Sequence, residues 1–166
     1  MSARPDTPGE DDPGGGRRLA VDVGSVRVGI ALSDPSPMLA SPLVTLSRDT
    51  DADSDIEQVA RLVVENEVAE VIVGLPRTLR NRHGVAAETA VRYADRLRDR
   101  LGTVPVRLAD ERLSTVSATK MLSDRGIKGR KQRAVVDQAA AVEILQGWLD
   151  ARAARRRTDE PGGKGA

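Results

Sequence analysis

Apolar residues recur along the chain with two spacings, and each spacing predicts a different kind of element. Short apolar runs bounded by Gly, Asp or Pro are typical of strands. Five such runs occupy residues 19–23, 28–32, 43–46, 71–75 and 104–108. Apolar residues three and four apart predict amphipathic helices. Segments with this spacing occupy residues 53–68, 85–101, 114–122 and 134–150.

The order of these elements predicts the topology of a sheet. The first two runs are separated by Gly24-Ser25, a turn sequence, so we expect them to pair as an antiparallel hairpin. The later strands alternate with helices, a pattern that favours parallel pairing. We therefore expect an α/β fold with a mixed five-stranded sheet, an opening antiparallel hairpin, parallel later strands and helices on both faces. The hairpin disfavours a plain doubly wound nucleotide-binding fold.

The two ends of the chain differ in composition from the middle. Residues 1–16 hold three prolines, three consecutive glycines and little apolar content, which predicts a disordered tail. Residues 152–166 hold three consecutive arginines followed by a Pro-Gly-Gly sequence, which predicts a flexible C-terminal tail. We therefore expect a single domain over residues 17–151.

Composition narrows the classes of protein that remain. The chain has no cysteine, which excludes disulfides, thiolate zinc sites and a cysteine nucleophile. Trp148 and Tyr93 are too few aromatic residues for a protein that stacks bases on aromatic platforms. No apolar run reaches the roughly 18 residues of a membrane span, and no apolar segment indicates a signal peptide. We expect a cytoplasmic protein, and the net charge of +1 alone implies no polyanionic partner.

Two carboxylates lie among apolar residues that we expect to be buried. Asp22 interrupts the first apolar run, where an ionised carboxylate is costly unless another group compensates it. Asp137 lies four residues before Ala141 and seven before Ile144, so it shares their face of the last predicted helix. Both also have a purely structural interpretation. Asp22 would cap the glycine turn that follows it, and Asp137 would favour the positive end of the helix dipole.

A third acidic position is the pair Asp110-Glu111, which follows the fifth predicted strand. Neighbouring residues of a strand face opposite sides, so only one of the two is expected to point into a shared site. The alternative for Asp110 is a cap on the next predicted helix. Three carboxylates from a strand, a strand end and a helix would suit one or two Mg²⁺ or Mn²⁺ ions, which prefer oxygen ligands. Such an ion polarises a phosphoryl group and lowers the pKa of bound water.

Four segments, taken in chain order, resemble the YqgF-type family. Residues 22–34 are similar to the DxGxxRxGxAxSD opening of that family, and the later segments are residues 73–76, 110–115 and 137–146. Members of the family are described as Holliday junction resolvases or pre-16S rRNA nucleases with an RNase H-like fold. The resemblance implies an acidic triad of Asp22, Glu111 and Asp137, and it is the resemblance that selects Glu111 over Asp110.

Basic residues gather in the stretch that precedes the last predicted helix. From Lys120 to Arg133 there are six basic residues, one acidic residue and two glycines. This stretch leads to Asp137 and would hold a nucleic-acid backbone beside the carboxylates; the alternative is a solvated loop. Arg27, on the hairpin turn, would reach a phosphate or stiffen the turn. The candidate nucleic-acid-binding residues are Arg27, Lys128, Arg130, Lys131 and Arg133.

The resemblance implies a metal-dependent endonuclease that processes the 5′ end of precursor 16S rRNA in ribosome biogenesis, associated with the ribosome, as a monomer or weak homodimer. One alternative is a Holliday junction resolvase, which cuts two strands symmetrically and needs a dimer. Another is a non-catalytic RNA- or ribosome-associated binding protein, against which the intact acidic triad argues. A third is ATP binding as in the actin and sugar-kinase superfamily, for which the chain supplies only one of two domains.

Overall fold

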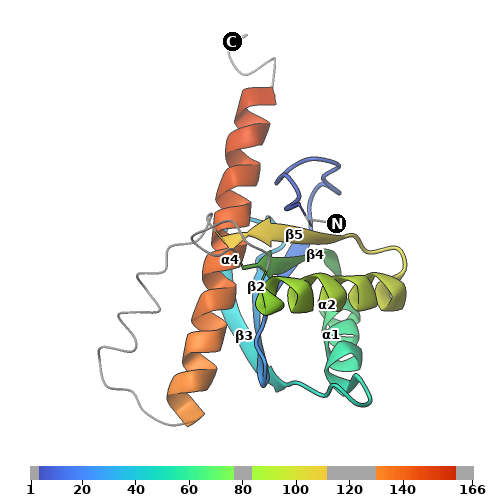
Figure 1. Ribbon diagram of the computed structural model, residues 1–166. Helices are drawn as coiled ribbons and strands as arrows, with labels where there is room; N and C mark the ends of the chain where they lie inside the picture. The colour runs from blue at the N-terminus through green and yellow to red at the C-terminus, as the bar shows by residue number, and fades with distance from the viewer. Residues whose placement is uncertain (1–3, 77–83, 112–129, 160–166) are drawn as a thin grey trace, which may run out of the picture.

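The computed structural model describes residues 4–76, 84–111 and 130–159. The five predicted strands and three of the predicted helices are present, and the helix expected over residues 114–122 lies outside the described residues. The elements, in chain order, are β1 (Arg17–Val23), β2 (Arg27–Ser33), β3 (Ala40–Ser47), α1 (Ser54–Glu65), β4 (Val68–Leu75), α2 (Val85–Leu101), β5 (Val106–Asp110) and α4 (Arg130–Asp159) (Figure 1).

The strands form a mixed sheet of the predicted kind. Its order is β3-β2-β1-β4-β5. The first three strands pair antiparallel, so β1 and β2 form the expected opening hairpin. The pairs β1–β4 and β4–β5 are parallel. The carboxyl ends of β1, β4 and β5 therefore lie at the same edge of the sheet.

Helices cover both faces of the sheet, as predicted (Figure 1). In β1, Leu19 and Val21 belong to the core beneath α1 and α2, whereas Ala20 packs against α4. Alternation along the strand places Asp22 on the same face as Ala20. The sheet residues that pack against α4 are mostly small, which lets this helix lie close to the strands: Ala20, Ala31, Ala40, Ile72 and Ala109.

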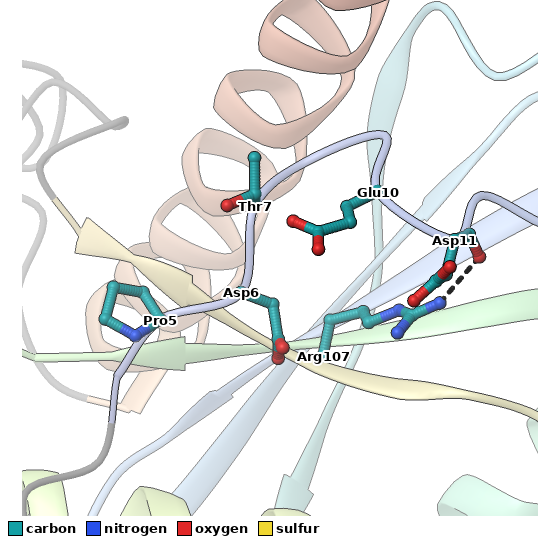
Figure 2. Close-up of a pocket in the computed structure, with 6 residues that line it drawn as sticks. All are labelled: Pro5, Asp6, Thr7, Glu10, Asp11 and Arg107. Atoms are coloured by element: carbon teal, nitrogen blue, oxygen red, sulfur yellow. Dashed lines mark hydrogen bonds between the residues drawn. The ribbon is translucent and has the colours of Figure 1, made fainter.

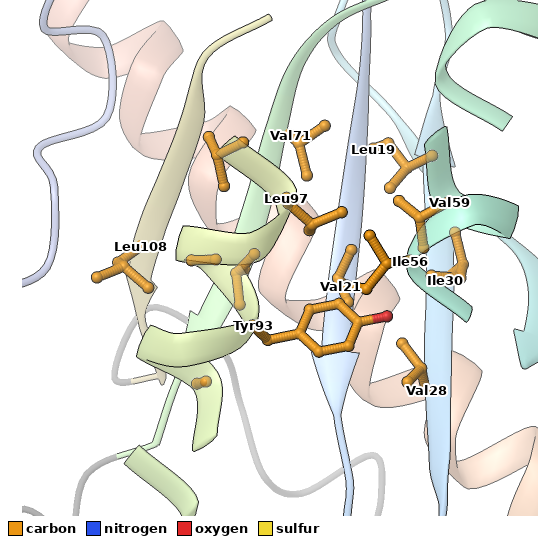
Figure 3. Packing of buried hydrophobic residues seen from close by; sticks show 14 of the residues in the cluster. Leu19, Val21, Val28, Ile30, Ile56, Val59, Val71, Tyr93, Leu97 and Leu108 are labelled. Atoms are coloured by element: carbon orange, nitrogen blue, oxygen red, sulfur yellow. The ribbon is translucent and has the colours of Figure 1, made fainter. Parts of the chain in front are cut away.

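Larger apolar side chains fill the opposite face. Ile56 and Val59 of α1 and Tyr93 and Leu97 of α2 are buried against the valines, leucines and isoleucines of the sheet (Figure 3). Burial of one such aliphatic side chain stabilises the fold by about 2 kcal/mol. The two faces thus differ: one holds a thick apolar core, and the other a helix pressed closely onto small residues.

The N-terminal segment differs from the predicted disorder in its described part, residues 4–16. The backbone N–H of Asp6 donates to the Leu108 carbonyl at 2.7 Å, and the Leu108 N–H donates to the Asp6 carboxylate at 2.7 Å. Asp12 accepts hydrogen bonds from Arg18 at 2.7 Å and from Arg152 at 2.8 Å. Charge pairs and backbone hydrogen bonds hold this segment against the domain. Its low apolar content could not predict these contacts.

Helix α4 also extends past the predicted end of the domain at residue 151. It continues to Asp159, and Arg152, which we expected in a flexible tail, is buried. Its guanidinium makes a two-pronged contact with the Asp12 carboxylate. The helix therefore continues because a distant acidic residue compensates the buried charge. No helix in the described ranges combines the length and the apolar character that crossing a bilayer requires.

A network of charges joins the beginnings of the parallel strands beneath α4. The fully buried Arg18 of β1 donates to the Glu70 carboxylate of β4 at 3.1 Å. Arg107 of β5 donates to the other oxygen of Glu70 at 3.0 Å. Each buried charge thus has a partner of opposite sign, as burial requires. This network lies at one end of the sheet face beneath α4, and Asp22 lies at the other end of the same face.

Candidate functional site

Asp22 lies next to last in β1, directly opposite Gly29 of β2. Its side chain is half-buried, on the face covered by α4. Gly29 has a specific role in this arrangement, because a Cβ at that position would overlap the backbone carbonyl of Asp137 in α4. Glycine thus lets the helix backbone rest on the hairpin, and this contact brings Asp137 beside Asp22.

A second glycine, Gly74 of β4, lets α4 pack closely against the same face. A Cβ on Gly74 would lie 2.5 Å from the Cδ1 atom of Ile144 in α4. Gly74 is the register partner of Ala109 in β5, and Ala109 also packs against α4. Glu111 follows β5 immediately, two residues beyond Ala109. Small residues on β4 and β5 therefore let α4 lie close to the strands that precede Glu111.

The electrostatics of Asp22 report that the three predicted carboxylates lie near one another. Burial, then the negative charge of Glu111, then that of Asp137 raise the pKa of Asp22 to about 7, from an ordinary value of 3.8. Burial and the charge of Asp110 raise the pKa of Glu111. A carboxylate whose neighbours are also negative is destabilised in its ionised form. A positive charge placed among them would remove that cost.

Arg27 supplies one positive charge at this place. Its Nε donates to Oδ2 of Asp137 at 2.9 Å, and the side chains are 29% and 23% exposed. The pair links the β1–β2 hairpin to α4. Both residues were predicted to lie near the site, but their pairing was not predicted, because 110 positions separate them and the sequence holds no local signal for it.

Asp22, Glu111 and Asp137 are the predicted ligands of a hard cation. Across residues 4–76, 84–111 and 130–159, no three His, Cys, Asp or Glu side chains are gathered closely enough to hold a metal ion. The chemistry of Asp22, Glu111 and Asp137 nevertheless fits Mg²⁺ or Mn²⁺, since carboxylate oxygens are the ligands that these ions prefer. The raised pKa of Asp22 is the response of a partly buried carboxylate to the nearby negative charges of Glu111 and Asp137.

The predicted basic residues are only partly covered by the structure. Lys128 lies outside the described residues. Arg130, Lys131 and Arg133 belong to the first turns of α4, the helix that carries Asp137 one to two turns further on. The basic stretch therefore leads into the same helix that reaches Asp22, as expected from the sequence.

A separate acidic pocket lies over the start of β5 (Figure 2). It has a volume of about 160 Å³, and the N-terminal segment contributes Asp6, Glu10 and Asp11 to its lining. Arg107 enters this pocket, donates to the Asp11 carbonyl at 2.8 Å and pairs with Glu70. The pocket lies at the opposite end of β5 from Glu111, so it is not part of the candidate site.

The two glycines beneath α4 should respond differently to the addition of a methyl group. Gly29→Ala forces the backbone of α4 away from β2 and should lower the free energy of unfolding by about 3 kcal/mol. Gly74→Ala meets only the tip of the Ile144 side chain, which can rotate, and should cost about 1 kcal/mol. Urea unfolding of both variants measures the difference. Equal losses would contradict a backbone contact at Gly29.

The raised pKa of Asp22 should make its contribution to stability depend on pH. Between pH about 4 and about 7 the folded protein keeps a proton that the unfolded chain releases, so stability falls as the pH rises. Asp22→Asn should therefore raise the free energy of unfolding at pH 8, by on the order of a few kcal/mol, with little effect at pH 4.

Asp49→Asn is the matched control for this measurement. Hydrogen bonds from the Ala52 backbone, the Ser54 hydroxyl and the Ser54 backbone lower the pKa of Asp49 to about 2, so its ionised form is stabilised by folding. This variant should lose stability at pH 8, the opposite sign. If Asp22→Asn changed stability equally at pH 4 and pH 8, the carboxylate cluster would be contradicted.

The chain is similar in sequence to one protein family and to several of its members. The family model described as "RuvX: Holliday junction resolvase" matches residues 16–151. A relative from Mycobacterium sp. (strain KMS), named "Putative pre-16S rRNA nuclease", is 53% identical over 161 residues, which cover 97% of this chain and 95% of the relative. A relative of the same name from Rhodococcus opacus (strain B4) is 52% identical and covers 96% and 91%.

Solved structures with a similar fold include that of a RuvC protein. RuvC from T. thermophilus, in complex with a Holliday junction substrate, matches with a TM-score of 0.50 and 13% sequence identity, covering 81% of this chain and 94% of that one. At this identity the likeness concerns the fold, and it confirms the predicted RNase H-like architecture. Because the family model spans most of the chain, and relatives more than half identical span nearly all of it, the chain belongs to the RuvX family.

Proposed function

We propose that this protein is a metal-dependent endonuclease that hydrolyses phosphodiester bonds in precursor 16S rRNA. The observation that carries the proposal is the convergence of negative charge on Asp22, which together with partial burial raises the pKa of that carboxyl to about 7. Strongly perturbed carboxylates of this kind gather at functional sites, because folding alone favours their separation or pairing. Membership of the RuvX family supports the same assignment.

Asp22, Glu111 and Asp137 would hold one or two Mg²⁺ or Mn²⁺ ions. When bound, such an ion activates water and stabilises the negative charge that develops on a phosphate. The chain's own contribution is to hold the carboxylates on β1, after β5 and on α4; β1 and β5 run parallel to β4, so two of the carboxylates lie at the same edge of the sheet. The small residues beneath α4 let this helix lie close to the strands, which brings Asp137 to Asp22.

Arg27 would bind the phosphate backbone beside these carboxylates. Its guanidinium already pairs with Asp137, so it lies beside the proposed site. A guanidinium is planar and can donate two parallel hydrogen bonds to a phosphate. We also assign phosphate binding to Lys128, Arg130, Lys131 and Arg133, which precede Asp137 in the chain. These residues would contribute affinity without base specificity, so binding should weaken as the salt concentration rises.

Precursor 16S rRNA is the proposed substrate because it appears in the name of two relatives. Both relatives are more than half identical to this chain, and the match covers nearly their whole length. We propose cleavage at its 5′ end, in the cytoplasm and in association with the ribosome. The second candidate is a four-way DNA junction, which the description of the family model supports. A junction resolvase requires two active sites in a symmetric dimer, whereas an rRNA nuclease acts as a monomer or a weak homodimer.

Cleavage assays on the two substrates test this proposal. The purified protein should cut precursor 16S rRNA only when Mg²⁺ or Mn²⁺ is present, and should leave a four-way DNA junction intact. Asp22→Asn should reduce cleavage by at least about 100-fold, more than the loss of an outer-shell partner of a metal costs. The same variant should still bind the RNA in a fluorescence anisotropy titration, because the basic residues are unchanged.

Asp95→Asn is the matched control, since Asp95 lies on the exposed side of α2 and pairs with Arg98. It should cleave like the unaltered protein. Cleavage of the junction alone would replace the proposed substrate with the second candidate. Full cleavage by Asp22→Asn would overturn the catalytic role of the carboxylates, and RNA binding without cleavage at any metal concentration would favour a binding protein.

A further inference from the structure

A buried carboxylate lies on the face of the sheet opposite the candidate site. Asp55, in the first turn of α1, is 1% exposed. Its oxygens accept a hydrogen bond from the Tyr93 hydroxyl at 3.0 Å and one from the Asp49 backbone N–H at 3.2 Å. An apolar residue would fill this place without the cost of burying a charge, so the contacts of the carboxylate call for an explanation.

Arg48 connects this carboxylate to the β1–β2 turn. Its Nε lies 3.7 Å from Oδ2 of Asp55, and its Nη1 donates to the carbonyl of Gly24 at 3.1 Å. The Arg48 guanidinium also lies 5.4 Å from the centre of the Tyr93 ring, within the range of a cation–π contact. The side chain thus extends from the buried core beneath α1 and α2 to the turn.

The turn itself is short and closely held. The Gly24 N–H donates to the Arg27 carbonyl at 2.9 Å, and the Arg48 N–H donates to the Val26 carbonyl at 2.8 Å. A Cβ on Gly24 would lie 2.8 Å from the same Arg27 carbonyl, so the turn needs glycine there. The turn is flanked by Asp22 on one strand and Arg27 on the other. Whatever fixes the turn also fixes these two side chains.

We propose that Arg48, oriented by Asp55 and Tyr93, is a positioning residue for Asp22 and Arg27. It holds the turn from the face opposite α4, so it touches neither the carboxylates nor the substrate. The inference rests on the function proposed above for Asp22 and Arg27. Displacement of a reacting group by about 1 Å can reduce a rate by about 100-fold, so a turn fixed from outside the site bears directly on activity.

The chemistry of the three residues fits this role. Only the forked guanidinium of arginine can contact Asp55 and the Gly24 carbonyl at once, because a lysine offers a single point of charge. Burial and the charge of Asp55 raise the pKa of Tyr93 above its ordinary value, so the hydroxyl keeps its proton and remains a donor. Asp55 thus receives a neutral donor on one side and a cation on the other.

Three single variants test the proposal. Arg48→Lys keeps the charge and loses the fork, and Tyr93→Phe keeps the ring over Arg48 and removes only the hydroxyl. The matched control is Arg100→Lys, because Arg100 pairs with Glu57 at 2.7 Å and thereby joins α2 to α1 on the surface, away from the turn. Each is measured by steady-state cleavage of precursor 16S rRNA and by NMR hydrogen exchange of backbone amides.

Arg48→Lys should lower kcat by about 10- to 100-fold and change KM by less than about 3-fold, since the chemistry and not the affinity depends on the turn. Exchange of the Gly24 amide should become at least about 10-fold faster, because opening of the turn exposes that donor. Tyr93→Phe should change both quantities in the same direction by less. Arg100→Lys should change neither.

The exchange measurement separates this inference from the proposed function. The Val71 amide, which donates to the Pro105 carbonyl at 2.9 Å, serves as the reference for the sheet as a whole. Equal acceleration at Gly24 and Val71 would mean general destabilisation and would overturn the positioning role, as would an unchanged Gly24 amide in Arg48→Lys. If the unaltered protein cleaved no nucleic acid, the proposed function would fail, and selective acceleration at Gly24 would still establish that Arg48 fixes the turn.

Discussion

The backbone of α4 rests on β2 at Gly29, and the position of Asp137 depends on this contact. A side chain at position 29 would overlap the Asp137 carbonyl, so the helix reaches the strand only because glycine has no Cβ. Alanines along the same face let the rest of the helix lie close as well. The approach brings the charge of Asp137 near Asp22, and mutual repulsion of the carboxylates is its electrostatic consequence.

Along α4, the residues between the helix and the sheet change from paired charges to apolar side chains and then to carboxylates. At the strand beginnings, Arg18 and Glu70 pair in a buried network, and near the C-terminal end of the helix Arg152 pairs with Asp12. The middle is apolar, with Trp148 fully buried against small sheet residues. At the other end like charges approach one another. Opposite charges therefore pair at the strand beginnings and near the end of the helix. Carboxylates repel one another at the place where we propose that the protein binds its cofactor and substrate.

The sequence predicted those features that depend on neighbouring residues. Apolar runs and helical spacing located the five strands and the described helices, and the polar interruption of the first run identified Asp22. Contacts between distant residues left no such signal: the pair Asp12–Arg152, 140 positions apart, joins two segments that were expected to be tails. Strand alternation could not choose between Asp110 and Glu111, so that choice depended on the family resemblance.

We propose that Asp22, Glu111 and Asp137 form one binding site for a hard cation. Paramagnetic broadening of backbone amide signals by Mn²⁺, added well below one equivalent, tests this claim most directly. The account predicts that the amides of these three residues broaden first and together, although they lie on β1, after β5 and on α4. Earlier broadening at Asp6, Glu10 and Asp11, in the acidic pocket over the start of β5, would contradict it.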